Sequence, residues 1–226
     1  MTIAISQRNE KTKNGSWDLL ESNYIVYYEK FGIILLPIPN VTANLKSYFD
    51  TTKINGIILS GGGDVNPSNY GGLVIEGDYS KERDETEKKL IKIAIKRKIP
   101  LFAQCRGSQL LNVFFGGQIM QNIKGKYKSN HVGVNHEISI VDKKASDFLG
   151  KNRFIVNSYH NHGIDENSLS NRLKAFAISN DSLIEGFYYP NYPIAGILWH
   201  PERNGSDKKM NKKLIRAFLD RKLFWK

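Results

Sequence analysis

One cysteine occurs in the chain of 226 residues, and its neighbours favour a working thiol. Cys105 lies in residues 103–109 (AQCRGSQ), between a predicted buried strand and a predicted helix. A thiol at a helix N-terminus has a lowered pKa, because the helix dipole stabilises the thiolate. Gly107 permits close backbone approach, and we expect Arg106 to add positive charge beside the sulfur. Cys105 is therefore a candidate nucleophile, with burial as a small hydrophobic residue as the alternative.

A base and an acid for that thiol stand near the C-terminus. His200 ends the last predicted strand, and Glu202 follows two residues later, with Pro201 between them. A cysteine, an imidazole and a carboxylate form a catalytic triad when each reaches the next. Proline restricts the backbone, so the carboxylate can lie beside the imidazole. A strand-end turn that leaves both side chains in solvent is the alternative.

Three consecutive glycines follow another predicted strand, at residues 61–63. Glycines there let backbone N–H groups point into the crevice at the carboxyl ends of parallel strands, where open α/β folds bind ligands. With the amide of Arg106, they could form an oxyanion hole. The run lacks the Lys and Ser/Thr spacing of a phosphate-binding P-loop, and a plain turn is the alternative.

These segments need a scaffold of alternating strands and helices. Apolar and β-branched runs predict strands at residues 3–6, 33–36, 54–60 and 101–104, the second ending at Pro37. Helical spacing predicts helices over 17–31 with Ser16 as the cap, near 45–49, over 81–98 and over 108–115. Strand, helix and strand in alternation imply a parallel sheet with right-handed crossovers.

The second half of the chain changes character. Short strand-like runs are separated by Asn, Ser, Gly and Pro, and they predict antiparallel strands that extend the sheet, at residues 137–141, 154–157, 175–179 and 194–199. A closing helix over 208–221 has one apolar face and a face rich in Lys and Arg. No repeat or linker divides the chain, so we expect one α/β domain over residues 1–226.

Composition narrows the functional classes. Apolar content of 40% with charged content of 24% is ordinary for a globular protein, which argues against disorder and fibrous architectures. The apolar runs are far shorter than the ~20 residues that span a bilayer, and residues 1–8 lack a signal-peptide pattern. We therefore expect a cytoplasmic protein with no membrane partner.

The net charge of +11 could indicate nucleic acid, an anionic surface or an acidic small substrate. No basic tract interleaved with aromatic residues stands out, so we expect no nucleic-acid partner. A general Lys-rich composition without a binding role is the alternative.

Taken together, the motifs resemble a known family. Residues 60–67 (SGGGDVNP), 105–109 (CRGSQ), 156–160 (VNSYH) and 200–202 (HPE) follow one another as in the γ-glutamyl hydrolases grouped as peptidase family C26. The same pattern includes Tyr70, Gly71, Arg83, Asp84, Glu87, Asn112, Gly116 and Gly117. The resemblance runs from about residue 3 to residue 202 and is nearest to the γ-glutamyl-γ-aminobutyrate hydrolase branch.

The resemblance implies a fold and a triad. The fold would be the flavodoxin-like class I glutamine amidotransferase fold, an α/β architecture with a mostly parallel central sheet flanked by helices and added antiparallel strands in the C-terminal half. Cys105 would be the nucleophile, His200 its general base and acid, and Glu202 the group that orients His200.

It also implies a reaction and a pocket. The backbone amides of Gly62, Gly63 and Arg106 would bind the oxyanion. Cys105 would attack the γ-carbonyl, release an amine and leave a glutamyl thioester that water cleaves, with no metal or organic cofactor. The residues expected to bind substrate are Gln109, Asn157, Ser158, Tyr159 and His160.

A metal site is the competing interpretation of the histidines. His131 and His136 flank a predicted strand start, and His160 and His162 lie two residues apart, but none of these spacings is that of a zinc site, and the single cysteine is committed elsewhere. We therefore expect no metal.

Two departures from the family pattern bear on the substrate. Gln104 stands before the nucleophile, where a small or apolar residue is common, and residues 161–163 (NHG) replace a common second His and Gln. We interpret both as substrate tuning, which weakens a direct transfer of the γ-aminobutyrate substrate.

The positive charge could favour a leaving group that carries phosphate. The Lys- and Asn-rich composition also resembles that of hydrolases that release cytidine diphosphoramidate and glutamate from γ-glutamyl-CDP-amidate in capsule phosphoramidate synthesis. We therefore expect a small-molecule γ-glutamyl amide as substrate, with this nucleotide-linked amide as the specific prediction and other γ-glutamyl amines as the alternative. A homodimer is left open.

Three other functions remain as alternatives. A glutaminase that feeds ammonia to a partner synthetase would need free glutamine, and residues 64–67 with Tyr70 and Gly71 argue against it. A redox or stress protein would leave Glu202 and the glycine run unexplained. The basic closing helix, with Lys208, Lys209, Lys212, Lys213 and Arg216, could bind an anionic surface or nucleic acid.

Overall fold

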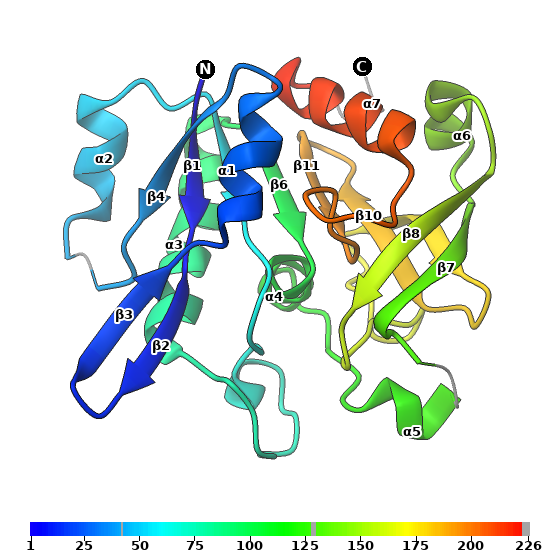
Figure 1. The fold of residues 1–226 in the computed structure, drawn as a ribbon, viewed down its shortest axis with the longest axis horizontal. Coiled ribbons are helices and arrows are strands. Elements are labelled where there is room, and N and C mark those ends of the chain that lie inside the picture. The colour runs from blue at the N-terminus through cyan, green and yellow to red at the C-terminus, as the bar shows by residue number, and fades with distance from the viewer. Residues whose placement is uncertain (42, 128–129, 223–226) are drawn as a thin grey trace.

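The computed structural model describes residues 1–41, 43–127 and 130–222 and has a large mixed sheet at its centre. One half of this sheet is parallel (Figure 1). Its strands are β4 (Ile34–Ile38), β1 (Thr2–Ser6), β5 (Gly56–Leu59), β6 (Leu101–Gln104) and β11 (Ile194–Ile197), in that spatial order.

The other half is antiparallel and continues from β11. Its strands are β10 (Ile184–Tyr189), β9 (Lys174–Ser179), β7 (Val132–Ile140) and β8 (Arg153–Tyr159), again in spatial order. The expected parallel core with added antiparallel strands is therefore confirmed. Strand β11 was expected among the antiparallel strands, but it pairs in parallel with β6 and meets the antiparallel half only through β10. The resulting sheet is continuous through both halves of the chain.

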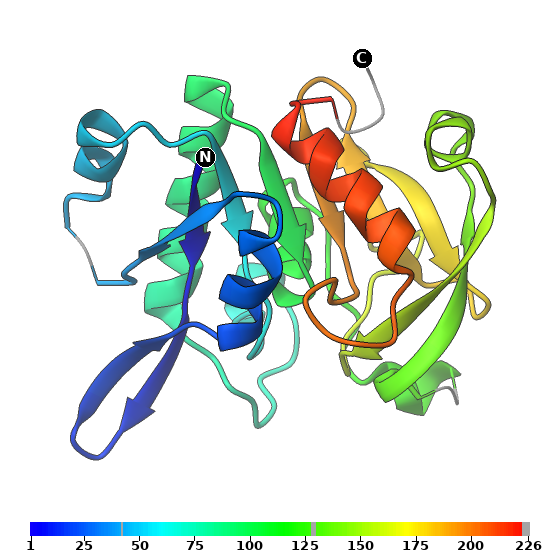
Figure 2. The ribbon, with the colours of Figure 1, turned by 45° about the horizontal axis from the view of Figure 1, so that its top comes forward.

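Helices cover both faces of the sheet (Figure 2). The helices α1 (Ser22–Glu29), α6 (Lys143–Leu149) and α7 (Lys208–Leu219) share one core cluster, and α2 (Leu45–Thr51), α3 (Lys81–Arg97) and α4 (Arg106–Phe114) share another. A short helix, α5 (Ile123–Tyr127), and a 3₁₀ turn (Pro67–Asn69) lie outside these layers. None of the helices in the described ranges could cross a bilayer.

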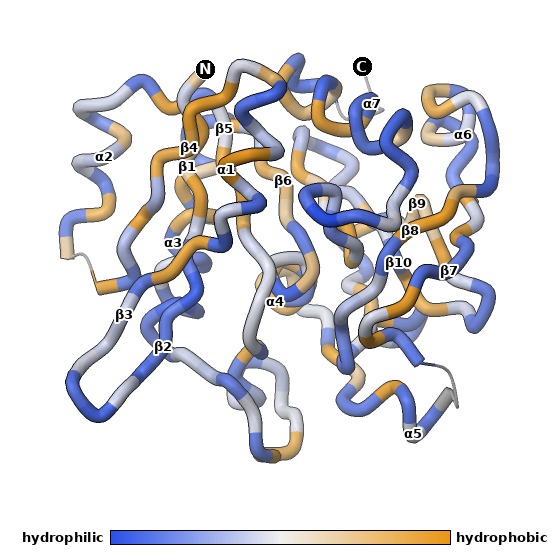
Figure 3. Tube along the Cα trace, in the orientation of Figure 1, coloured by the Kyte–Doolittle hydropathy of each residue, from blue (hydrophilic) through white to orange (hydrophobic). Residues whose placement is uncertain are grey.

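Side chains of a central strand alternate between the two cores, one on each face of the sheet. Ile3 and Ile5 of β1 belong to the core under α1 and α7, whereas Ala4 between them belongs to the core under α3. Successive side chains of a strand point to opposite faces, which explains why these strands are buried throughout their length. In Figure 3 the central strands are largely apolar, whereas the outer segments are more polar.

The start of the chain differs from the sequence-based expectation. A helix over 17–31 was expected, but residues 8–19 form a hairpin of β2 (Arg8–Thr12) and β3 (Gly15–Leu19), and the helix begins only at Ser22. Asn14 and Gly15 favour a hairpin turn, and the Asn9 amide donates hydrogen bonds to Ser16 and Asp18 across it. Local turn chemistry overrode an apparent helical periodicity.

Further differences concern one strand boundary and three elements that the sequence did not predict. Pro37 does not end its strand: it lies inside β4, which is an edge strand whose outer side needs no proline N–H. Strand β10 was not expected, although it is almost wholly buried. Helices α5 and α6 were also missed, because each is too short for a clear hydrophobic period.

Candidate active site

Cys105 occupies a sharp elbow between β6 and α4. Its backbone has φ 48° and ψ −113°, in the left-handed region that few side chains adopt, and its N–H donates to the Ile197 carbonyl at 2.8 Å. A Cβ at Gly107 would lie 2.6 Å from the Leu59 carbonyl oxygen, so only glycine allows α4 to approach β5 this closely. This is the geometry of a nucleophile elbow, which holds the sulfur at the carboxyl end of the sheet.

The thiol and His200 perturb each other strongly. Burial raises the pKa of the Cys105 thiol, but the charge and hydrogen bond of His200, together with the charge of His160 and the Arg106 amide, lower it by more, so this pKa lies below its usual range. Burial lowers the pKa of His200, but the negative charges of Cys105 and Glu202 raise it to about 10. The pair therefore favours a thiolate next to an imidazolium at neutral pH.

Glu202 lies beside the imidazole, as the His-Pro-Glu spacing predicts. His200 Nδ1 and Glu202 Oε1 are 2.5 Å apart, and the carboxylate is fully buried. Asn157 holds this loop from the end of β8: its side-chain oxygen accepts from the His200 N–H at 2.8 Å, and its amide donates to the carbonyls of His200 and Asn204, each at 2.8 Å. The imidazole is thus fixed through both its ring and its backbone.

The glycine loop presents free amides near the thiol. Gly62 and Gly63 have φ of 87° and 70°, and the N–H of Gly61 donates to the Tyr24 hydroxyl at 2.8 Å. Within the described part of the chain, the N–H groups of Gly62 and Gly63 have no protein acceptor. Both glycines line the cavity that contains Cys105, together with Arg106, whose amide interacts with the sulfur.

Arg83 explains why those amides face the cavity. Its Nη1 donates to the Gly62 carbonyl at 2.6 Å, and its Nη2 donates to the carbonyls of Ser60 and Gly61 at 2.8 and 3.0 Å. In a trans peptide the C=O and the next N–H point in opposite directions. Because Arg83 holds the carbonyls of Gly61 and Gly62 on one side, the N–H groups of Gly62 and Gly63 point to the other. Arg83 belongs to the family pattern, but the sequence alone indicated no function for it.

Arg106 contributes its backbone and not its charge. The expectation that its guanidinium lies beside the sulfur is wrong, because this side chain is buried and pairs with Asp84 and Glu87. Glu87 also accepts from Arg83 Nε at 2.9 Å and from the Ser6 hydroxyl at 2.7 Å. Two arginines and two carboxylates therefore form one buried network behind the loop, a placement that demands full pairing.

A cavity of about 340 Å³ brings the expected site residues together. Its wall carries both signs of charge: Arg8 pairs with Asp78 at 2.7 Å, and Arg203 lies over the Tyr159 ring at 4.6 Å. Its lining residues include Gly62, Gly63, Asp64, Cys105, Arg106, Gln109, Tyr159, His160, Asn161, His162 and His200. Such a site suits a small zwitterionic ligand.

Not all of the expected pocket residues reach this cavity. Gln109, Tyr159 and His160 line it, whereas Asn157 and Ser158 are buried outside the lining and hold neighbouring loops in place. Ser158 donates to the His131 carbonyl at 2.8 Å.

Gln104 also lies apart from the cavity. Its amide donates to the Tyr28 hydroxyl at 2.6 Å within the core under α1. Substrate tuning by Gln104 is therefore not supported, while Asn161 and His162 remain in the wall.

A second group of titratable side chains adjoins His160. His131, His160 and Glu185 each offer one ligand atom, and these atoms all lie within 4.8 Å of one another. Glu185, on the unexpected strand β10, was missed by sequence analysis, and no local motif could have indicated it. His162 is turned elsewhere: its Nδ1 accepts from the Asn122 N–H at 3.2 Å.

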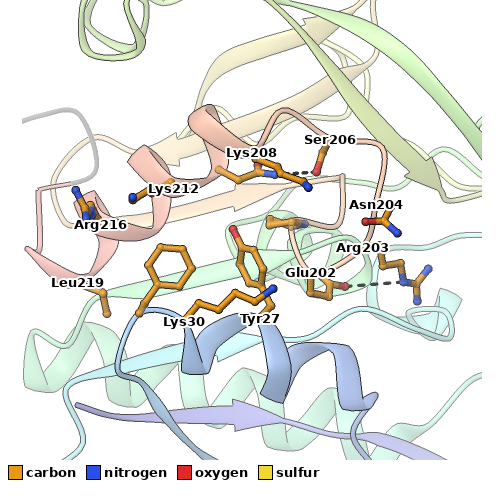
Figure 4. Close-up of a pocket in the computed structure, with 13 residues that line it drawn as sticks. Tyr27, Lys30, Glu202, Arg203, Asn204, Ser206, Lys208, Lys212, Arg216 and Leu219 are labelled. Carbon is orange, nitrogen blue, oxygen red and sulfur yellow. Dashed lines mark hydrogen bonds and ion pairs between the residues drawn. The ribbon is translucent and has the colours of Figure 1, made fainter.

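A larger cavity, of about 550 Å³, lies on the other side of the His200 loop. Figure 4 shows Tyr27 of α1 and Lys30, which directly follows α1, opposite Lys212 and Arg216 of α7, with Glu202 and Arg203 at one end. It contains neither Cys105 nor His200.

Part of the basic helix has an internal role, since Lys213 donates to the Leu149 carbonyl at 2.9 Å, at the C-terminus of α6.

This chain is similar in sequence to a known family of proteins. A model of the peptidase C26 family matches residues 1–202. The chain is 37% identical to a γ-glutamyl-CDP-amidate hydrolase of Campylobacter jejuni, over 66% of this chain and 63% of that protein. It is 32% identical to a γ-glutamyl-γ-aminobutyrate hydrolase of Escherichia coli O157:H7, over 74% of this chain and 71% of that protein.

Solved structures agree on the fold. A glutamine amidotransferase from Thermotoga maritima superposes with a TM-score of 0.59 at 18% identity, covering 97% of this chain and 82% of that one. The expected class I glutamine amidotransferase fold is therefore confirmed.

Proposed function

This chain belongs to the peptidase C26 family, and from that premise we propose that it is a cysteine hydrolase that cuts a γ-glutamyl amide bond. One observation carries the proposal. Cys105, at its strained elbow, shares a cavity with His200 and with the two unpaired amides of Gly62 and Gly63. A nucleophile, a proton carrier and oxyanion donors around one cavity are the parts that acyl transfer needs.

Acylation uses the thiolate that His200 stabilises. The Cys105 sulfur attacks the γ-carbonyl carbon, and the developing oxyanion accepts hydrogen bonds from Gly62, Gly63 and Arg106 N–H groups. His200 then gives its proton to the leaving nitrogen, the C–N bond breaks and the amine departs. A glutamyl thioester remains on Cys105.

Deacylation reverses the proton flow. Neutral His200 takes a proton from a water molecule, which attacks the thioester carbonyl within the same oxyanion site. The C–S bond breaks, glutamate leaves, and the thiolate and imidazolium are restored. Glu202 keeps Nδ1 of His200 occupied throughout, so that the other ring nitrogen serves the sulfur, the leaving group and the water.

The charges of the cavity support a γ-glutamyl substrate. A glutamyl group carries an α-ammonium and an α-carboxylate, and the wall offers Asp64 and Asp78 for the first and Arg8 for the second. As the specific substrate we propose γ-glutamyl-CDP-amidate. Its diphosphate would meet Arg203, whose side chain is 27% exposed. The name of the C. jejuni relative supports the same choice. γ-Glutamyl-γ-aminobutyrate is the alternative, which the E. coli relative supports.

Glutamate release from a panel of amides tests both levels of the proposal. The panel contains γ-glutamyl-CDP-amidate, γ-glutamyl-γ-aminobutyrate, a γ-glutamyl peptide and glutamine, each with the wild type and Cys105→Ala. We expect one amide to be cleaved with kcat/KM of about 10⁴ M⁻¹s⁻¹ or more and the variant to be inactive. Cleavage of glutamine alone would favour an ammonia-supplying glutaminase, and no release from any amide would reject the proposed reaction.

A further inference from the structure

Three imidazoles surround one buried carboxylate beside the substrate cavity. Glu185 is fully buried on β10, and its Oε1 lies 3.6 Å from His131 Nδ1, 3.7 Å from His136 Nε2 and 3.5 Å from His160 Nε2. His131 directly precedes β7, His136 lies within β7, and His160 directly follows β8. The sheet thus brings together side chains from three separate segments of the chain.

Most inner atoms of this cluster lack hydrogen bonds, the exception being His131 Nδ1, which lies 3.3 Å from the Ser158 hydroxyl oxygen. Both carboxylate oxygens of Glu185, and the Nε2 atoms of His136 and His160, are buried with no hydrogen-bond partner among the described residues. Buried polar atoms are nearly always paired, and an isolated buried carboxylate is costly. An ion between these atoms would pair all of them at once.

The outer nitrogens are held in the way metal ligands are held. His131 Nε2 lies 3.0 Å from Asp181 Oδ2, His160 Nδ1 lies 2.9 Å from the His162 carbonyl, and His136 Nδ1 lies 3.3 Å from the Glu137 carbonyl. Each partner is a hydrogen-bond acceptor, which suits an N–H at each outer nitrogen and leaves the other ring nitrogen facing Glu185. Metal-binding histidines are oriented in this manner by a carboxylate or a carbonyl.

The spacing of the inner atoms fits a small ion. Zinc ligands at 2.0–2.1 Å in a tetrahedron stand roughly 3.4 Å apart. The three distances from Glu185 Oε1 to the imidazole nitrogens are 3.5, 3.6 and 3.7 Å, and the ligand atoms of His131, His160 and Glu185 all lie within 4.8 Å of one another, so an ion would draw the imidazoles toward each other. We propose that His131, His160 and Glu185 bind a divalent transition-metal ion, zinc by first preference, with His136 as the fourth ligand.

The donor set selects the class of metal. Three imidazoles with one carboxylate suit zinc and its neighbours, whereas magnesium and calcium prefer sites made of oxygen alone. The site differs from the expectation of no metal because that expectation considered spacings along the chain and could not include Glu185. It does not depend on the proposed hydrolase function, since no step of that reaction uses the ion.

Zinc binding to a variant without the thiol tests this inference. The full chain carrying Cys105→Ala is stripped with a chelator, and bound zinc is measured by calorimetry and by elemental analysis after gel filtration. We expect one equivalent per chain, and Co²⁺ in its place should give the intense visible absorption of a tetrahedral site. Absence of binding would overturn the proposal, because the inner charge would then be balanced by a proton alone.

Matched variants locate the ion. Glu185→Gln, made in the same background, keeps the shape and removes the charge, and we expect at least a 100-fold loss of zinc affinity. Should that variant fail to fold, Asp181→Asn provides a second measurement: it leaves the ligands in place and should weaken binding about 10- to 100-fold. His162→Ala is the control and should bind as the parent does. Equal binding by Glu185→Gln, or by Asp181→Asn where it is the variant measured, would place the zinc elsewhere and reject the site.

Discussion

Arg83 holds Gly62 by a 2.6 Å hydrogen bond from its Nη1 to the glycine carbonyl. The same guanidinium donates to the carbonyls of Ser60 and Gly61, and its Nε donates a hydrogen bond to Glu87. A planar group with fixed donors can orient three carbonyls together, which the single ammonium of a lysine cannot do. The direction of the Gly62 and Gly63 amides therefore depends on a residue that does not itself line the cavity.

Arg83→Lys should damage catalysis more than substrate binding. Loss of one oxyanion donor typically costs about 100- to 1000-fold in kcat, and we expect a loss in that range with a much smaller change in KM. Steady-state kinetics on the substrate identified in the panel measures both constants. Arg97→Lys, at the far end of α3, is the matched control and should retain full kcat. An unchanged kcat in Arg83→Lys would show that the loop holds its shape without the guanidinium.

Gly61→Ala should displace the catalytic imidazole. A Cβ at residue 61 would lie 2.7 Å from His200 Cε1 and 3.3 Å from the Cys105 Cβ, and neither group can move without leaving its partner. We expect at least a 100-fold lower kcat, because small errors in catalytic geometry cost about that much. Gly125→Ala, whose new Cβ would meet nothing closer than 3.4 Å, should leave the kinetics unchanged.

The reactivity of Cys105 should follow two titrations. The thiol pKa is lowered, so the thiolate exists above that lowered value, and the His200 pKa is raised to about 10, so the imidazolium persists below about pH 10. The alkylation rate with iodoacetamide should therefore be nearly constant at neutral pH and fall on acidification. In His200→Ala the rise should move to higher pH, since burial alone raises the thiol pKa. An unmoved inflection would mean that His200 does not stabilise the thiolate.

Replacement of Cys105 should be visible at His200. The thiolate charge is the largest of the effects that raise the His200 pKa, so Cys105→Ala should lower that pKa while Glu202 still raises it. Titration of the imidazole resonance by NMR in the two proteins gives the comparison. The His162 resonance serves as an internal reference, and a His200 pKa that stays at about 10 would contradict the proposed pairing.

Glu202→Gln should lower kcat with little effect on folding. The amide keeps the size of the side chain but removes the charge that favours a protonated Nδ1 at 2.5 Å. Changes of this kind in a triad cost about 10⁴-fold in kcat. Glutamate release measures the loss, and a thermal melt shows whether the protein is intact. Activity within 10-fold of the wild type would remove Glu202 from the orienting role.

Local sequence was enough wherever the geometry is made by neighbouring residues. The elbow at Cys105 needs only a buried strand, a helix start and Gly107, all within a few positions. The pairing of His200 with Glu202 likewise depends on a two-residue spacing across proline. The parallel strands followed from apolar runs that alternate with helices, because such runs must be covered on both faces.

Tertiary structure decided whatever depends on reach across the sheet. The Arg106 guanidinium pairs with Asp84 and Glu87, and the Gln104 side chain points into the core, although both residues adjoin the nucleophile in sequence. Alternation along the backbone sets such directions, yet which face is cavity and which is core emerges only when the layers assemble. The hairpin at residues 8–19 shows the reverse case, where turn chemistry outweighed periodicity.

The sequence by itself therefore determined the family, the fold class and the candidate nucleophile with its base, since these rest on short spacings and local patterning. It could not reveal that Arg83 aims the oxyanion amides or that Glu185 stands among three histidines. Those contacts join β10 to residues around β7 and β8, and α3 to the loop after β5. Side chains so distant along the chain meet only because strand order and register bring their elements together, and no local preference specifies that order.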